Sequence, residues 1–266
     1  CATFLEAVLE AVSEDSLAHA VERVAVAAAR VCKPDTMAEL VRRLLTTAAV
    51  SADEDVRNVA IRSVMRGLVR STNDNIVQAI QVTQVGIRAM IELVQTNEDV
   101  PMIAVMRSVP MGALDVIGDA DARILRLCES MAVPVIETAE NKENLLTIAD
   151  AIAFGSVESA CQNYAKGDVA AKGVTIGFMK AAAPELKGDL ARAISNGAVR
   201  GTCRKNKLRD VYEKVLEGMR ESDSDDYIDD AVDGGEDAIQ DEIDERKEET
   251  IDPIPPIDDP PPASPF

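Results

Sequence analysis

The chain has 266 residues, a formal net charge of −19 and a hydrophobic content of 47%, but only 3% of its residues are aromatic and Trp is absent. A chain of this length can bury a core, and side chains of Ala, Val, Leu, Ile and Met must build it, which favours closely packed helices over sheets. No run of 18 apolar residues indicates a membrane span, and no signal peptide is evident. The composition predicts an all-α protein.

The first half of the chain predicts five helices. Lys33-Pro34-Asp35 stops the second of them, and Thr36 with Glu39 forms a capping box for the third. The clearest helix covers 73–95, because its polar residues share one stripe and its Ile and Met residues lie opposite. That stripe contains Gln78, Gln81, Gln84, Arg88, Glu92 and Gln95. The five helices are expected over 3–12, 17–31, 37–50, 56–70 and 73–95.

The second half continues with shorter helices. The segment 102–117 is almost uncharged, so we expect it to be buried, and Pro110 should kink or split it. A helix that opens at 118–121 is expected to end at Met131, and Pro134 closes it. Further helices are predicted over 145–154, 157–164, 169–182, 190–195 and 208–219.

The charge is concentrated at the C-terminal end. Residues 221–266 hold 18 acidic and two basic residues, a net charge of −16, which leaves 29 acidic and 26 basic residues, or −3, in residues 1–220. Dense like charge with few apolar residues favours disorder, and the last fourteen residues are rich in proline. We therefore predict a helical domain over 1–220 and a disordered acidic and proline-rich tail over 221–266. Ser222 and Ser224, which lie among acids, are candidate phosphorylation sites.

Similar segments recur along the chain. Ser51-Ala-Asp-Glu-Asp-Val56 and Thr96-Asn-Glu-Asp-Val100 begin helices 45 residues apart, and Thr138-Ala-Glu-Asn141 follows after 42. Two helices in each 40 to 47 residues is typical of helical solenoids. Over roughly residues 13–200 the chain resembles HEAT and armadillo repeat proteins, and DEDVRNVAIRSV at 53–64 is similar to the second half of such a repeat. The resemblance implies a protein-binding scaffold with a concave surface. A compact irregular multi-helix bundle is the alternative.

Two groups of basic residues could bind an anionic partner. Arg62, Arg66 and Arg70 follow one another at intervals of four, which places them on one helix face. That pattern suits phosphate contacts, but it is more typical of a solvated face whose charges complement the helix dipole. The second group is first interpreted as solvated charge at the start of a helix, and the alternatives are contact with the acidic tail or with nucleic acid or phosphate. Phosphorylation of the two serines would strengthen the contact with the tail. The second group consists of Arg200, Arg204, Lys205, Lys207 and Arg209.

The sequence offers little for catalysis. His19 is the only histidine, and no P-loop, GxGxxG or HExxH motif occurs. We predict no enzyme activity, no cofactor and no metal site. The five widely spaced cysteines form no CxxC pair and indicate free thiols in a reducing, cytoplasmic or nuclear compartment. A secreted protein with two disulfides, or a lipid anchor at Cys1, is the alternative.

Taken together, the sequence predicts a non-enzymatic interaction or assembly scaffold that binds protein partners, among them other copies of itself. The alternative is a nucleic-acid-associated helical protein whose basic surface is masked by the acidic tail. A third hypothesis is a chaperone for basic proteins that acts through the tail. Nucleic-acid binding would weaken steeply with salt and strengthen when the tail is deleted.

Overall fold

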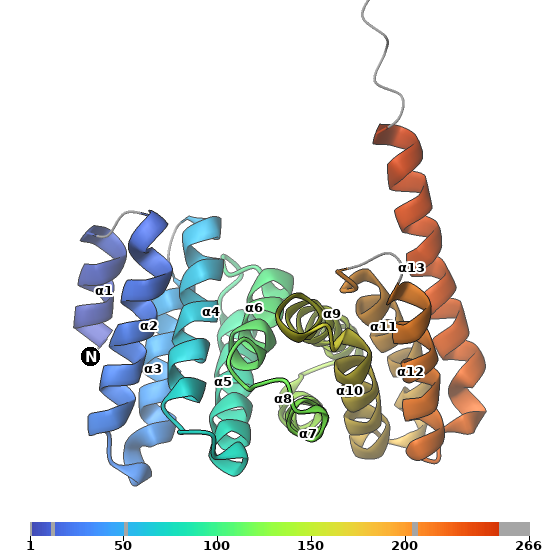
Figure 1. The fold of residues 1–266 in the computed structure, drawn as a ribbon, viewed down its shortest axis with the longest axis horizontal. Helices are drawn as coiled ribbons and strands as arrows, with labels where there is room; N and C mark the ends of the chain where they lie inside the picture. Colours follow the sequence, from blue (N-terminus) through green and yellow to red (C-terminus); the bar gives the residue numbers. More distant parts are fainter. Residues whose placement is uncertain (1, 12–13, 51–52, 204–206, 250–266) are drawn as a thin grey trace, which may run out of the picture.

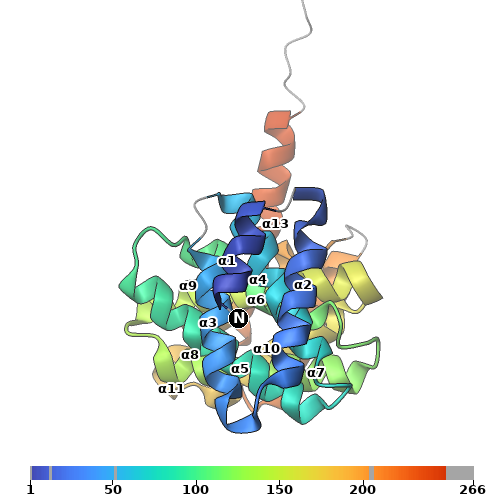
Figure 2. The ribbon, with the colours of Figure 1, turned by 90° about the vertical axis from the view of Figure 1, so that its left-hand side faces the viewer.

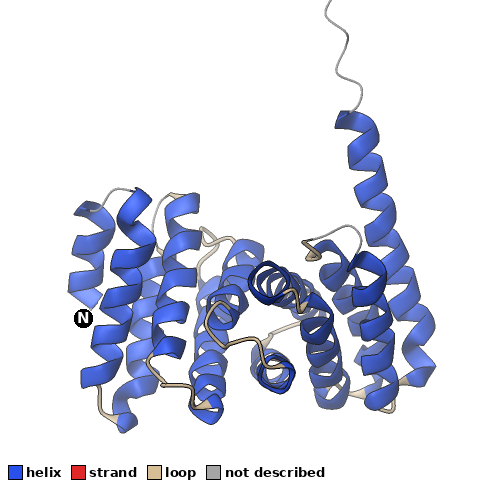
Figure 3. Cartoon of the chain, in the orientation of Figure 1, coloured by secondary structure: helices blue, strands red, loops and turns tan. Residues whose placement is uncertain are grey.

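The described part of the chain is entirely helices and turns. The computed structural model describes residues 2–11, 14–50, 53–203 and 207–249, and it contains no strand within these ranges (Figure 3). The prediction of an all-α protein is therefore confirmed. In the same ranges, no helix combines the length and the apolar content that crossing a membrane requires.

The helices form two layers that run side by side from one end of the molecule to the other (Figure 1). Each helix packs against the helix before it and the helix after it in its own layer, which is the arrangement of an α-solenoid. The first layer consists of α2 (Glu14–Val31), α4 (Glu54–Arg70), α6 (Met102–Leu114), α9 (Lys142–Tyr164), α11 (Pro184–Arg200) and α13 (Ile228–Glu249). The second layer consists of α1 (Ala2–Ala11), α3 (Met37–Ala49), α5 (Ile76–Thr96), α7 (Asp121–Ser130), α8 (Ala132–Thr138), α10 (Gly167–Ala181) and α12 (Leu208–Glu221).

Several helices begin at side-chain caps. The Asp53 carboxylate accepts a hydrogen bond from the Val56 amide at 3.0 Å, and Asn75 and Asn141 cap α5 and α9 in the same way. The capping box predicted at Thr36 and Glu39 does not form. Instead, residues 34–36 make a 3₁₀ turn, and the Thr36 hydroxyl donates to the Lys33 carbonyl at 3.0 Å.

Several predicted helix boundaries differ from the structure, among them that of the helix expected over 190–195, which is α11 and covers Pro184–Arg200. α6 continues through the buried Pro110 without a break, and Pro134 lies inside α8 and does not end a helix. The two helices expected over 145–154 and 157–164 are the single helix α9. Gly155 lies between them in the sequence, and its small size serves packing against a neighbouring helix, as described next.

Each step of the first layer contains one close helix-to-helix contact at a glycine. A Cβ atom added to Gly112 would lie 2.2 Å from the main-chain oxygen of Arg62 in α4, so only glycine permits this approach. We call these positions the glycine contacts. The five pairs are Gly67 with Glu22, Gly112 with Arg62, Gly155 with Arg107, Gly197 with Asp150, and Gly234 with Arg192.

The glycine contacts follow a fixed register. Each of four successive helices carries both a contact glycine and, five positions before it, the residue whose carbonyl meets the glycine of the next helix. In α4, for example, Gly67 is preceded by Arg62, whose carbonyl meets Gly112 of α6. The other three are Arg107 before Gly112, Asp150 before Gly155, and Arg192 before Gly197. The first layer is therefore a true repeat, in which equivalent residues make equivalent contacts.

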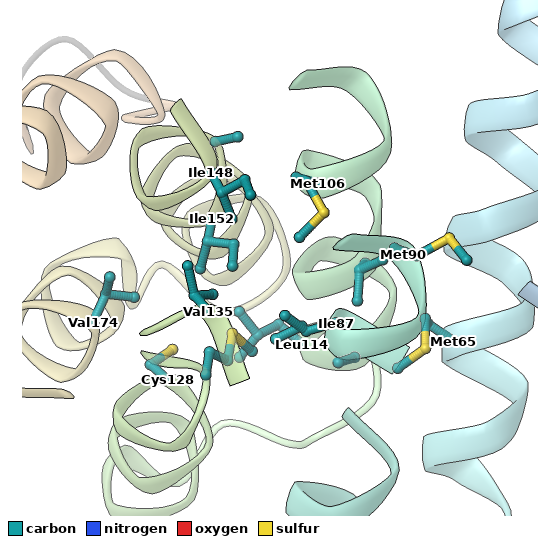
Figure 4. Packing of buried hydrophobic residues seen from close by; sticks show 14 of the residues in the cluster. Met65, Ile87, Met90, Met106, Leu114, Cys128, Val135, Ile148, Ile152 and Val174 are labelled. Atoms are coloured by element: carbon teal, nitrogen blue, oxygen red, sulfur yellow. The ribbon is translucent and has the colours of Figure 1, made fainter. Parts of the chain in front are cut away.

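One continuous apolar core fills the space between the layers. Met65 of α4, Met90 of α5 and Met106 of α6 belong to this core and are fully buried (Figure 4). The same core continues through Leu114 and Ile152 toward α10. Ala and Val are the most frequent buried side chains where Trp is missing and Phe is rare, and unbranched Met adapts to irregular gaps between the helices.

The helical body does not end at residue 220, where the sequence analysis placed its boundary. α12 leads through a 3₁₀ turn (Asp225–Tyr227) into α13, which packs along α11. Ala231 and Ala238 of α13 are buried, and the Tyr227 hydroxyl donates to the Pro184 carbonyl at 3.1 Å. The last turns of α13 project beyond the other helices (Figure 1). The proline-rich part of the predicted tail, residues 250–266, lies outside the described residues.

A disulfide joins two neighbouring parts of the first layer. Cys161 in α9 is bonded to Cys203 after α11, with 5.8 Å between their Cα atoms. The prediction of free thiols is therefore wrong for these two residues. Cys32 and Cys128 are free, with Cys128 fully buried, and Cys1 lies outside the described residues.

Candidate functional site

The predicted arginine row of α4 points toward acidic side chains of the neighbouring helices. Arg62 donates two hydrogen bonds to the Asp115 carboxylate, at 2.7 and 2.8 Å, and Arg66 donates to the same carboxylate at 2.9 Å. Arg66 also lies 3.5 Å from Glu22 of α2, and Arg70 forms an ion pair with Glu22. Three arginines thus share two acids whose side chains are only 4% and 7% exposed.

Asp115 lies at the centre of this network. The hydroxyl of Ser159 and the amide of Asn163, both from α9, donate to it at 2.9 Å. Burial alone raises the pKa of Asp115, but the hydrogen bonds from Arg62 and Ser159 and the charges of Arg62 and Arg66 outweigh it and hold the pKa below its ordinary value. Asp115 is therefore a carboxylate that links α4, α6 and α9.

The same side-chain pattern recurs along the first layer. At each glycine contact, the residue whose carbonyl meets the glycine also has a side-chain partner on the helix that carries the glycine. That partner stands one position before the glycine or three positions after it. Arg107 stacks on Phe154 with 4.0 Å from its guanidinium carbon to the ring centre, and Asp150 lies 3.7 Å from Arg200. Arg192 meets Asp233 and Asp237 at 3.2 and 3.6 Å.

The predicted basic segment 200–209 does not form one continuous patch. Arg200 bonds Asn196 at 3.2 Å, and Lys207 and Arg209 form ion pairs with Asp210 and Glu213 of α12 at 2.6 and 2.7 Å. Arg204 and Lys205 lie outside the described residues. Of the eight basic residues predicted to form one surface, those of α4 and those near α12 lie in separate regions of the molecule (Figure 1).

The two candidate phosphorylation sites are buried in the turn between α12 and α13. Ser222 is 7% exposed, and its hydroxyl donates to the Gly218 carbonyl at 2.8 Å. Ser224 is 1% exposed, and it accepts a hydrogen bond from Lys187 at 3.2 Å. A kinase could reach either hydroxyl only after this turn opens.

A cavity of about 470 Å³ lies between the α2–α3 and α4–α5 hairpins. Its volume is in the range of binding sites for small molecules and peptide side chains. Met37, Val41 and Val82 give it an apolar lining. Polar groups border it, and these are Arg30, Cys32, Ser71, Thr72, Asn73, Gln78 and Gln81.

The polar stripe of α5 explains why glutamines border this cavity. Farther along the stripe, Gln84 donates to the Ser130 carbonyl at 2.9 Å, Arg88 pairs with Glu137 and Glu92 pairs with Arg42. These contacts bind α5 to α3, α7 and α8. Gln78 and Gln81, at the start of the helix, are exposed, and their amide groups face no hydrogen-bond partner in the described part of the chain.

The described residues contain no metal centre. No group of three or more His, Cys, Asp or Glu side chains is placed to hold a metal ion there. His19 is exposed on α2, beside Glu22 and Arg23. The cavity with its glutamines is therefore the candidate functional site of this part of the molecule.

Comparisons with known proteins give no relative: no family model, no curated protein and no solved structure matches the chain. The candidate site consequently depends on its own geometry. The sequence analysis found the glutamine stripe but not the cavity, because the residues that complete it come from α2, α3 and the α4–α5 turn.

Proposed function

We propose that the protein is a non-enzymatic scaffold that binds a protein partner. The observation that carries this proposal is the internal pairing of the first layer. Asp115 and Glu22 engage the arginine row, and the glycine contacts fix the helices at a constant register. A rigid repeat array with satisfied internal charges is suited to presenting an extended surface.

The same pairing weighs against the nucleic-acid alternative. A phosphate-binding face needs cations that are free to replace counterions. The Arg62 guanidinium already donates two hydrogen bonds to a carboxylate, and phosphate would have to displace that carboxylate from a largely buried position. We expect no binding of single-stranded nucleic acid at about 150 mM salt, measured by fluorescence anisotropy.

The cavity between the hairpins is the proposed binding site for an extended peptide segment of the partner. An extended strand needs partners for its main-chain amide and carbonyl groups, and a glutamine amide supplies both a donor and an acceptor. Gln78 and Gln81 border the cavity, and Met37, Val41 and Val82 can receive an apolar side chain. Arg30 at the border favours a peptide with an acidic residue.

Peptide display on the full chain tests this proposal. Binders should lose their affinity for the Ala38→Trp variant, since Ala38 is exposed and lines the cavity. The matched control is Ala122→Trp, at an exposed alanine of α7 that does not line it. Bound peptide should also slow the alkylation of Cys32, followed by mass spectrometry of the labelled peptide. Peptides that bind the Ala38→Trp variant with unchanged affinity would contradict the proposed site.

A further inference from the structure

The two ends of the first layer have faces that no helix covers. α2 has a neighbour only on its α4 side, and α13 only on its α11 side, and the two ends lie at opposite sides of the molecule (Figure 1). Figure 2 looks onto the end formed by α1, α2 and α3. A contact between the two ends therefore requires two copies of the chain.

The register of the glycine contacts identifies the equivalent residues on both open ends. Five residues before Gly234 stands Asp229, which is exposed and occupies the position of Arg192, Asp150, Arg107 and Arg62. Five residues after Glu22 stands Ala27, which is exposed and occupies the position of the glycine. The outer face of α13 therefore has the residue that would supply the carbonyl of a further contact. The outer face of α2 has alanine at the position where the other helices have the glycine.

The charges on these faces are complementary. In the repeat, the residue three positions after the glycine pairs with the side chain of the carbonyl residue, as Arg70 pairs with Glu22. On α2 this position is Arg30, and the corresponding carbonyl residue on α13 is Asp229. Arg30 and Asp229 are both exposed and have no ion pair in the described part of the chain. The same holds for Arg23, on α2 with Arg30, and for Glu236, on α13 with Asp229.

At the ends of the second layer, α1 exposes Glu6 and Glu10, and α12 exposes Arg209 and Arg220 together with Glu213 and Glu221. If a second copy continues the two layers, its α1 meets α12 at the same time as its α2 meets α13. The first layer then brings unlike charges together, whereas joining two identical ends of that layer would bring like charges together.

We propose that copies of this chain associate head to tail, with the outer face of α13 of one molecule docked on the outer face of α2 of the next. This inference deepens the proposed scaffold function and rests on it. The Ala27 Cβ prevents an approach as close as the internal glycine contacts, so the association is weaker than the packing within the chain. A head-to-tail interface does not close at two copies, and it leads to longer assemblies as the concentration rises.

Sedimentation velocity of the full chain over a concentration series tests the proposal. We expect assemblies that grow beyond the dimer with concentration and that dissociate as salt is raised. Arg23→Glu, at a residue outside the cavity that Arg30 borders, and separately Asp229→Lys with Glu236→Lys, should each weaken the association at least about tenfold. A mixture of the two charge-reversed chains should associate again, because opposite charges then meet.

A substitution at the glycine position gives the most specific test. Ala27→Gly restores the residue found at the other five contacts and should shift association to lower protein concentration, whereas Ala27→Leu should abolish it. Circular dichroism checks that both variants remain helical. These variants leave the cavity unchanged, so peptide binding can fail or succeed independently of this result.

Three results would overturn the inference. The first is a monomer at every concentration up to about 1 mM. The second is a species that stops at a dimer, which indicates a two-fold contact between identical faces. The third is loss of association in a chain that ends at residue 249, which would make residues 250–266, and not α13, the occupant of the basic α2 face.

Discussion

In the N-terminal half of the molecule, the two layers are held together in different ways. In the first layer every step contains a glycine on a main-chain carbonyl and a side-chain pair beside it. In the N-terminal half of the second layer, half-exposed ion pairs such as Arg42 with Glu92 and Arg88 with Glu137 connect the helices. The second layer is also where one repeat is divided into the short helices α7 and α8. In the N-terminal half the first layer thus sets the register, whereas in the C-terminal half Gly177 of α10 makes the same kind of contact, since a Cβ atom added to it would lie 2.2 Å from the main-chain oxygen of Glu129 in α7.

The largest expected effect is the loss of Asp115 from the first layer. Asp115→Ala removes the acceptor of hydrogen bonds from Arg62, Arg66, Ser159 and Asn163, and it leaves two arginines without their carboxylate. We expect the free energy of unfolding to fall by about 3 kcal/mol in urea denaturation. The control is Asp233→Ala, whose carboxylate is 60% exposed. Equal effects at the two positions would contradict the contrast between internal and surface pairs.

A smaller loss is expected at a glycine contact. Gly112→Ala places a methyl group 2.2 Å from the Arg62 oxygen, so α4 and α6 must separate. Overpacking of this kind costs about 2 kcal/mol, even though alanine favours a helix by about 1 kcal/mol over glycine. At Gly188 in α11 the nearest atoms belong to the Asp230 side chain, which can move, so Gly188→Ala should leave stability unchanged or raise it. Thermal unfolding of the two variants distinguishes them.

The stability of the first layer should depend on pH in two opposed ways. The pKa of Asp115 is lowered in the folded state, so its contribution is present at neutral pH and is lost as the pH falls from about 5 through the folded pKa. The pKa of Asp150 is raised, chiefly by burial, so its protonation at low pH favours the folded state and its contribution is lost as the pH rises. Urea titrations should show a shallower acid dependence for Asp115→Asn and a steeper one for Asp150→Asn.

The smallest effect is expected in the second layer. The Arg88 and Glu137 side chains are 41% and 58% exposed, and an ion pair of that exposure contributes less than about 1 kcal/mol. Arg88→Ala should therefore change the urea midpoint little, and 1 M salt should reduce the difference further. A loss as large as that of Asp115→Ala would show that the second layer also determines the register.

The sequence predicts the helices well and the packing partners poorly. Apolar periodicity and caps such as Asp53 and Asn75 locate most helices to within a few residues. A charged residue stands five positions before each glycine of the series 67, 112, 155, 197 and 234, but the same holds for Gly173, Gly177, Gly218 and Gly235, so this pattern alone does not identify the series. Its irregular spacing, and the division of α7 and α8, obscure it among the other glycines.

Two features could not be read from local sequence. The acids of 221–241 indicate disorder, yet Ala231, Gly234, Gly235 and Ala238 give α13 a narrow face of small residues that fits α11 and α12. The acidic partners of the arginine row are also far from it in the sequence, since Asp115 lies 53 residues beyond Arg62. A solvated face and an internally paired face have the same spacing of arginines, and only the position of the next helix distinguishes them.

The disulfide between Cys161 and Cys203 also sets how the molecule responds to force. It encloses a separation of 42 residues, among them α10 and α11. If the chain is pulled from its two ends, this segment bears no load while the bond is intact. Its unfolded length of about 140 to 150 Å is released only under reducing conditions. The oxidised protein is therefore a shorter tether than the reduced one, and the redox state of one bond sets its maximum reach.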